Sequence, residues 1–138
     1  MALLFENMRP LDRMEVEAAS GPDVLATLYD SWELTPNPES AWADGKLLAV
    51  RGIVPGGRMG CIWMLGTNEL GRYRGAHTRL ARRYIETALE VYDVLYNYVH
   101  IKNEPSIRWL DRLGFTFGEP QPVGRAKELF IRFEKSRV

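Results

Sequence analysis

The 138-residue sequence contains a single cysteine, two histidines and no net charge at neutral pH. With only Cys61 available, no internal disulfide can form, which is typical of a protein from a reducing compartment. The apolar residues that follow it, Ile62 and Trp63, predict a buried thiol, with a reactive thiol as the alternative. No group of Cys, His and carboxylate residues has metal-ligand spacing, so we expect no metal site.

Long apolar runs are also lacking, and no segment approaches the length of a membrane-spanning helix. Met1–Phe5 has no basic region and is soon followed by charged residues, so we expect no signal peptide and no secretion. The absence of net charge argues against a general attraction to nucleic acid or anionic membranes. Five arginines could still form a basic patch, but without the aromatic pattern of a nucleic-acid site: Arg72, Arg74, Arg79, Arg82 and Arg83.

Length and hydrophobic periodicity predict one α/β domain over residues 1–138. The expected elements are an edge strand at Ala2–Met8, helices at Asp12–Ala19 and Asp23–Trp32, strands at Ser40–Ala43, Leu47–Val54 and Met59–Leu65, a helix at Gly75–Tyr92, a strand at Leu95–Ile101, a short helix after Asn103, and strands from Phe115 and at Lys127–Glu134. Ser20 is the expected cap of the second helix, and Glu119–Gly124 is an expected loop. The predicted order is β-α-α-β-β-β-α-β-α-β-β.

The stretch Tyr92–Phe117 is the centre of this arrangement. Asn103 follows a strand of the buried type and can N-cap a helix that begins with Glu104-Pro105. Apolar residues then recur at helical spacing, and a glycine ends the helix: Ile107, Leu110, Leu113 and Gly114. A strand, a short capped helix and a second strand therefore form one compact unit.

The element order and the pattern Asn-x-x-x-Ile-x-x-Leu-x-x-Leu-Gly-Phe, which starts at Asn103, resemble the GNAT N-acyltransferase fold. The resemblance implies an α/β (α+β) domain with a mixed, mostly antiparallel central sheet, helices on both faces, and acetyl-CoA or CoA as the cofactor. It also implies that the strand Met59–Leu65 binds the pantetheine arm at Met64 and Leu65, and that Asn103 faces the cofactor. A purely structural capping role would explain Asn103 equally well.

The pyrophosphate loop of GNAT proteins reads Gln/Arg-x-x-Gly-x-Gly/Ala, and the corresponding stretch here is Arg72-Tyr73-Arg74-Gly75-Ala76-His77. The partial match implies phosphate binding at a helix N-terminus by Arg72, Arg74, Gly75 and Ala76. His77 stands where a small residue is expected and would crowd the phosphates. A solvated basic loop is the alternative.

The sequence offers only substitutes for the usual catalytic groups. Many active GNAT proteins have a tyrosine, the general acid for the leaving thiolate, four residues before the Gly of Leu-Gly-Phe; Leu110 occupies that position here. Tyr98 is the candidate replacement. Glu69, just after the strand Met59–Leu65, is the candidate base, with an exposed loop charge as the alternative. For His100 we expect ordinary packing or hydrogen bonding.

A second resemblance covers the chain from Met8 to Glu134. Its specific part is the run Leu-x-Asn-Tyr-Val, Asn, Ile-Arg-Trp-Leu and Leu-Gly-Phe between Leu95 and Phe115, supported by Trp63–Thr67 and by Arg13–Gly21 and Ala41–Gly52. These segments resemble the internal virion protein A family of short-tailed phages and prophages. The resemblance implies a GNAT-like domain used in virion assembly, where it helps internal ejection proteins enter the capsid.

Two functions therefore stay open. One is an assembly protein that retains an acyl-CoA cleft; the other is an active acetyl-CoA-dependent N-acetyltransferase that modifies a host or phage amine. Leu110 and His77 count against the second. The implied partners are other phage internal or ejection proteins or a host protein, in the host cytoplasm during infection or in the phage particle. A homodimer through a sheet edge or a helix face is a further alternative.

Overall fold

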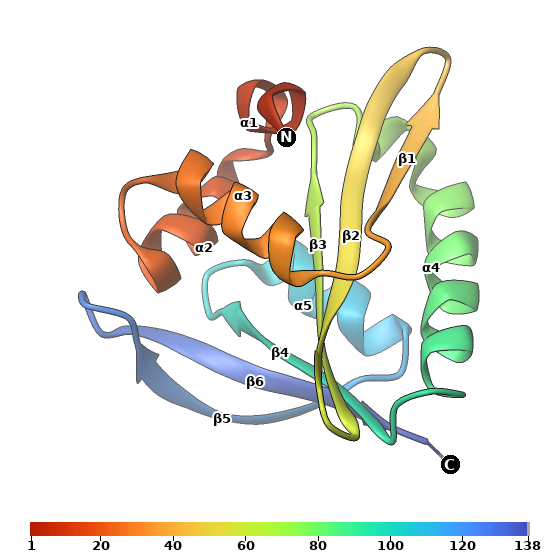
Figure 1. Cartoon of the computed structure of the whole chain (residues 1–138). Coiled ribbons are helices and arrows are strands. Elements are labelled where there is room, and N and C mark those ends of the chain that lie inside the picture. The colour runs from red at the N-terminus through yellow and green to blue at the C-terminus, as the bar shows by residue number, and fades with distance from the viewer. Residues whose placement is uncertain (138) are drawn as a thin grey trace.

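A computed structural model describes residues 1–137 and shows a six-stranded sheet with helices on both faces (Figure 1). The helices are α1 (Ala2–Asn7), α2 (Pro10–Ser20), α3 (Val24–Leu34), the 3-10 helix η1 (Leu70–Tyr73), α4 (Arg74–Ala88) and α5 (Glu104–Arg112). The strands are β1 (Glu39–Ala43), β2 (Lys46–Gly56), β3 (Met59–Gly66), β4 (Val94–His100), β5 (Thr116–Val123) and β6 (Glu128–Ser136). The expected mixed, mostly antiparallel sheet is confirmed. No helix among the described residues is both long and apolar enough to cross a membrane.

Two hydrophobic cores hold the helices on the sheet. Helices α1, α2 and α3 lie on one face, and α4 and α5 lie on the other (Figure 1). Under α1 and α3, Leu4 and Leu28 are packed with Val50 of β2. Under α4 and α5, Ile85 and Leu110 are packed with apolar side chains of β4 and β6, including Leu95, Val99 and Phe133. Burial of these apolar side chains is the main force that fixes both helical layers.

The sheet consists of two antiparallel parts that meet at one parallel pair. Strands β1, β2 and β3 pair antiparallel, as do β4, β6 and β5. Strands β3 and β4 are parallel, and their pairing joins Met59–Cys61 only to Val94–Tyr96. We call these three residue pairs the parallel seam. A seam this short leaves the remainder of β3 and β4 free to separate.

The N-terminal segment is a helix, so the predicted edge strand at Ala2–Met8 is wrong. Leu4 and Met8 are both buried, whereas Leu3 is 45% exposed. Burial four residues apart is the periodicity of a helix, and Ala, Leu and Glu favour helix formation. What remains of the expected strand is one isolated antiparallel bridge between Met8 and Thr67.

The predicted loop at Glu119–Gly124 is also wrong, because β5 continues to Val123. Pro120 and Pro122 are tolerated there since β5 is an edge strand, where a missing N–H need not break a ladder bond. The register shifts between Phe117 and Pro120, which accommodates the prolines in the strand.

Helix α3 begins later than predicted. Ser20 is the last residue of α2, and Asp23 is the N-cap of α3: its carboxylate accepts a hydrogen bond from the Ala26 N–H at 3.1 Å. Gly21 separates the two helices with a φ of 99°, a conformation that glycine adopts without strain. The expected cap at Ser20 is therefore replaced by the acid three residues further on.

Replacing each of the two candidate cap residues by alanine shows which of them caps α3. Asp23→Ala should lower the free energy of unfolding by about 1 kcal/mol, because the first turn of α3 loses its acceptor. Ser20→Ala is the matched control and should change stability by less than about 0.5 kcal/mol, since Ser20 is exposed at the end of α2. Urea denaturation of both variants measures this; an equal loss in both would contradict the assignment.

Candidate functional site

An opening lies between β3 and β4 beyond the parallel seam, and Asn97 holds its narrow end. The Asn97 Nδ2 donates to the Ile62 carbonyl at 2.7 Å, and its Oδ1 accepts from the Tyr98 N–H at 2.8 Å. One side-chain amide thus replaces the backbone bonds that the next rung of a parallel ladder would have supplied.

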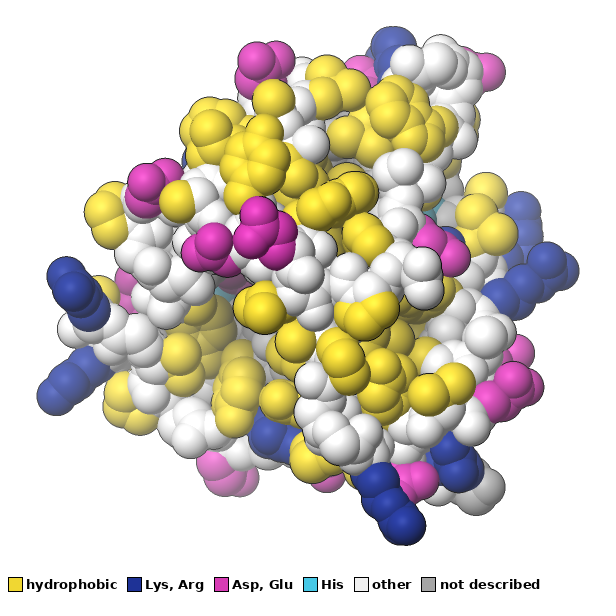
Figure 2. All heavy atoms as spheres, viewed as in Figure 1, with side chains coloured by type: hydrophobic (Ala, Val, Ile, Leu, Met, Phe, Trp, Pro, Cys, Tyr) yellow, Lys and Arg dark blue, Asp and Glu magenta, His cyan; other side chains and the backbone are white. Residues whose placement is uncertain are grey.

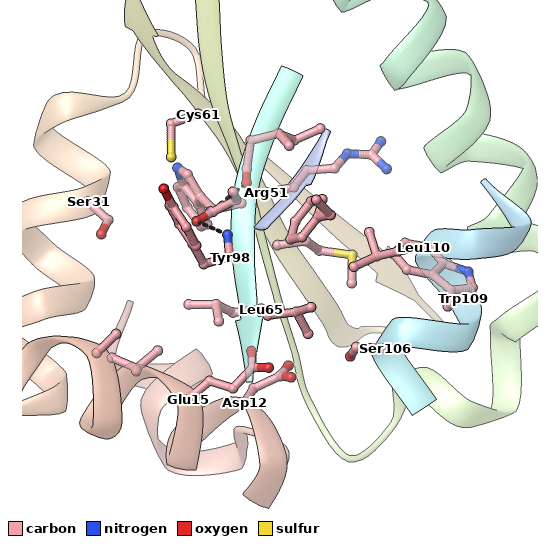
Figure 3. Close-up of a pocket in the computed structure, with 18 of the residues that line it drawn as sticks. Asp12, Glu15, Ser31, Arg51, Cys61, Leu65, Tyr98, Ser106, Trp109 and Leu110 are labelled. Atoms are coloured by element: carbon pink, nitrogen blue, oxygen red, sulfur yellow. Dashed lines mark hydrogen bonds between the residues drawn. The ribbon is translucent and has the colours of Figure 1, made fainter. Parts of the chain in front are cut away.

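Two carboxylates of α2 satisfy backbone groups at the wide end of the opening. Asp12 accepts from the Gly66 N–H at the end of β3 (2.7 Å), and Glu15 accepts from the His100 N–H at the end of β4 (2.9 Å). Residues three apart on a helix share a face, so both side chains reach the opening together (Figure 3). Helix α2 therefore bonds to both strand ends.

Met64 lies midway along the β3 edge of the opening. Alternate residues of a strand direct their N–H and C=O to the same edge, and both Ile62 and Gly66 use the edge that faces β4. The N–H and C=O of Met64 therefore also point into the opening, and no side chain of the described residues bonds to them. This backbone pair is available to a ligand.

A cavity of about 340 Å³ occupies the opening and reaches both faces of the sheet. Its lining on the α2–α3 side includes Glu15, Cys61 and Tyr98, and on the α4–α5 side Tyr84 and Leu110. Figure 3 shows Cys61 and Tyr98 on one side of the opening and Leu110 on the other. Two reactants that approach from opposite faces could meet in such a cavity.

A second cavity, of about 180 Å³, lies beside the start of α4 and is strongly basic. Its lining contains four arginines and, among the described residues, no acid: Arg9, Arg74, Arg108 and Arg112. Tyr73, the N-cap residue of α4, contributes no side-chain hydrogen bond to the first turn of the helix. The positive end of a helix dipole and arginine side chains together favour an anion.

Met64, His77 and Trp109 lie between the two cavities, and we call these three side chains the His77 wall. Met64 and Trp109 line both cavities. The His77 Nε2 lies 2.9 Å from the Met64 Sδ, and the imidazole is stacked on the Trp109 indole with 5.4 Å between ring centroids. His77 thus fills the space that a small residue in the pyrophosphate loop would leave open.

Burial sets the protonation of the cavity residues. It raises the pKa of Glu15 to about 7, although the Asn103 and His100 donors act in the opposite direction. Burial lowers the pKa of His77 to about 4, so its imidazole is neutral at pH 7. Burial also raises the pKa of Cys61, which opposes formation of a reactive thiolate. Glu15 is therefore a cavity group that can exchange a proton near neutral pH.

The structure brings part of the predicted site together. Met64, Leu65 and Tyr98 line the cavity between the strands, as does Leu110 at the position of the usual acid, and Arg74 lines the basic cavity. The other predicted phosphate ligands lie nearby on exposed backbone at the end of η1 and the first turn of α4: Arg72, Gly75 and Ala76.

Glu69 and Asn103, like those three residues, line neither cavity. Glu69 precedes η1, and its carboxylate is 3.6 Å from the Lys46 ammonium, because the chain turns away from the opening after β3. Asn103 is 1% exposed; it caps α5 by accepting from the Ser106 N–H and donates to Glu15 at 2.9 Å. The contacts of Asn103 are those of the structural alternative.

His100 and Cys61 can be compared with their expected roles. His100 is packed and hydrogen-bonded as expected: its Nδ1 accepts from the Lys102 N–H, and its Nε2 lies 2.8 Å from the Glu128 carboxylate. Cys61 is only half-buried, because it lines the cavity instead of the core.

Four residues of the site are missing from the predicted set: Asp12, Glu15, Arg51 and Asn97. Asp12 and Glu15 share a helix face with buried Ala18, and acids on such a face were the available signal. Asn97 and Arg51 gave no comparable signal, since their positions depend on which strands pair.

Several solved structures with a similar fold are described as acetyltransferases. An acetyltransferase of Bacillus subtilis in complex with CoA has a TM-score of 0.69 and 13% identity over 100% of this chain and 93% of its own. The ribosomal-protein-S18-alanine N-acetyltransferase of Escherichia coli has a TM-score of 0.64 and 15% identity over 92% and 86%. Spermidine N-acetyltransferase of Vibrio cholerae, in complex with CoA and spermine, has a TM-score of 0.65 and 13% identity over 98% and 89%. The expected GNAT fold is confirmed.

A comparison with curated protein sequences finds no match. A family profile described as "Bacteriophage T7, probable scaffold protein Gp13" does match, over residues 44–120. This segment is more than half of the chain and contains β2, β3, β4 and α5, which form both sides of the opening. The chain therefore belongs to the Bacteriophage T7 probable scaffold protein Gp13 family.

Proposed function

We propose that this protein binds an acyl-CoA thioester between β3 and β4 and acts in the assembly of a phage particle. The observation that carries the binding proposal is the unpaired N–H and C=O of Met64 inside the opening. A pantetheine amide offers the complementary C=O and N–H, so it can add to the β3 edge as a further strand would. The acyl group then lies in the 340 Å³ cavity.

The basic cavity suits the phosphates of the same ligand. Arg74, Arg108 and Arg112 supply positive charge beside the N–H groups of the first α4 turn. A side chain added at Gly75 would meet no atom within 4 Å, so there is open space over this turn. The His77 wall lies across the path between the cavities, so its side chains must rotate when the pantetheine arm binds.

The assembly role is supported by the match to a probable scaffold protein family. Leu110 fits this role, because its hydrocarbon side chain cannot protonate a leaving thiolate and a bound thioester would not be consumed by that route. The partner we propose is another phage internal or ejection protein, met in the host cytoplasm during infection.

N-acetyl transfer is a second candidate function, which Glu15 favours. Its carboxylate lines the cavity and has a pKa of about 7, so it can accept the proton of an attacking amine. The amine nitrogen would then bond to the thioester carbonyl carbon as the C–S bond breaks, and the Tyr98 hydroxyl is the candidate donor to the thiolate. Release of free CoA thiol with an added polyamine would reveal turnover.

Acetyl-CoA should raise the melting temperature of the purified chain in a saturable manner. Ligand bound only to the native state stabilises it by about 2.7 kcal/mol at 100 times Kd. Differential scanning fluorimetry from micromolar to millimolar acetyl-CoA measures the shift, and a flat melting temperature throughout would contradict binding.

Variants of α4 locate the site of this effect. Gly75→Trp should abolish the shift, because the indole would fill the space over the first helical turn. Arg83→Trp places the same side chain on an exposed part of α4 outside both cavities and should leave the shift intact. His77→Ala should tighten binding about tenfold, since the wall no longer competes with the ligand. An intact shift in Gly75→Trp would place the phosphates elsewhere.

Deleting the gene for this protein from its phage should yield particles that lack internal proteins. Mass spectrometry of purified particles measures their content, and wild-type protein supplied from a plasmid should restore it. Complementation by Glu15→Gln would separate assembly from transfer, because this variant lacks the candidate base. Normal particle content in the deletion would overturn the assembly role.

Stability should report the titration of Glu15. The pKa is about 7 in the folded state against 4.5 for the ordinary group, so folding favours the protonated carboxyl. Below pH 4.5 the carboxyl is protonated in both states, and the free energy of unfolding is not reduced. Between pH 4.5 and 7 the unfolded state releases its proton first. Above pH 7 the free energy of unfolding is therefore lower by about 3 kcal/mol. Glu15→Gln keeps the acceptor oxygen but cannot titrate. Urea denaturation from pH 4.5 to 8 should show wild type losing stability relative to the variant; a constant difference would contradict this.

A further inference from the structure

Arg51 is a cationic side chain that lines the cavity. In the proposed binding mode, one of its guanidinium nitrogens has no hydrogen-bond acceptor. Arg51 lies in the middle of β2, paired with Met64 of β3, and lines the 340 Å³ cavity (Figure 3). Its side chain is only 14% exposed, and its Nη1 is buried with no hydrogen-bond partner among the described residues.

Other atoms of the Arg51 guanidinium have contacts within the chain. Its Nε donates to the Glu39 carboxylate at 3.0 Å, and its guanidinium carbon lies 4.7 Å from the centre of the Tyr84 ring. His77 is neutral and close enough for Arg51 to contribute to its lowered pKa. A buried N–H without an acceptor lowers the stability of the folded state. An oxygen of a ligand could accept a hydrogen bond from this N–H.

The other side chains that line the cavity restrict which ligand could supply the oxygen. The lining of the same cavity includes apolar side chains besides Met64: Ile62, Ala81, Ile85 and Leu110. A short methylene chain matches these walls, and a carboxylate at its end would match the free guanidinium N–H. A purely apolar acyl group would fill the same space but leave Nη1 unpaired.

We propose that the acyl group taken by this cavity ends in a carboxylate, and that Arg51 selects it. This inference rests on the proposed acyl-CoA binding and names the substrate class within it, a short dicarboxylic acyl thioester. The distinction from acetyl or butyryl groups comes from one charge-assisted hydrogen bond to a largely buried guanidinium, which discriminates more strongly than a missing methylene does.

Isothermal titration of the full chain with succinyl-CoA, butyryl-CoA and free CoA tests this. Succinyl-CoA should bind about tenfold or more tightly than butyryl-CoA, which has a similar length but no charge. Arg51→Met should remove the difference between the two thioesters while CoA itself still binds, which also shows that the variant is folded. Glu39→Gln is the matched control: it removes the ion pair at the exposed Nε side, retains Nη1, and should keep the preference.

The outcomes separate the two proposals. If butyryl-CoA binds as tightly as succinyl-CoA, the acyl-group inference is overturned while acyl-CoA binding stands. A preference that persists in Arg51→Met also overturns it, since another group must then recognise the carboxylate. If none of the three ligands binds, the proposed binding function fails and this inference fails with it.

Discussion

The separation of β3 and β4 beyond Cys61 and Tyr96 is the constraint on which the rest of the site depends. Each unpaired backbone group in a buried strand edge costs free energy comparable to a lost hydrogen bond. Side chains meet most of this demand: the Asn97 amide at the narrow end, Asp12 and Glu15 at the wide end. Since both carboxylates belong to α2, one helix bonds to the ends of both strands that border the opening.

The two carboxylates are stabilised in different ways. Asp12 forms a two-point contact with the Arg9 guanidinium, with N–O distances of 2.9 to 3.0 Å, so its buried charge has a partner. The hydrogen-bond donors to Glu15 are neutral groups of His100 and Asn103. Burial raises the pKa of both carboxyls, and it outweighs the opposing effect of the Arg9 charge on each. Because Arg9 lines both cavities, the Arg9–Asp12 pair also joins the basic cavity to the opening.

Local signals explain what the sequence predicts well. The Asn103 cap, the helix after it and the β1–β2 hairpin are each specified by neighbouring residues, and the structure confirms them. Contacts between distant segments have no such signal: Glu15 bonds to a backbone N–H 85 residues away, and Asn97 acquires its role only where the parallel seam stops. The segment Ala2–Met8 is so short that its hydrophobic pattern fits a helix and a strand equally well. Its contacts with Thr67 and α3, which the sequence does not reveal, decide between them.

Keeping β3 and β4 apart and catalysing acyl transfer require different residues of this fold. The opening is stable without a ligand, because Asn97, Asp12 and Glu15 satisfy most of its backbone groups from within the chain. Transfer needs two further proton movements, one away from the amine and one onto the thiolate. Glu15 is suited to the first, whereas Leu110 cannot perform the second, for which Tyr98 is the candidate. Meanwhile the His77 wall opposes entry of the pantetheine arm. Leu110 and the His77 wall therefore count against turnover, in keeping with the assembly role that we propose.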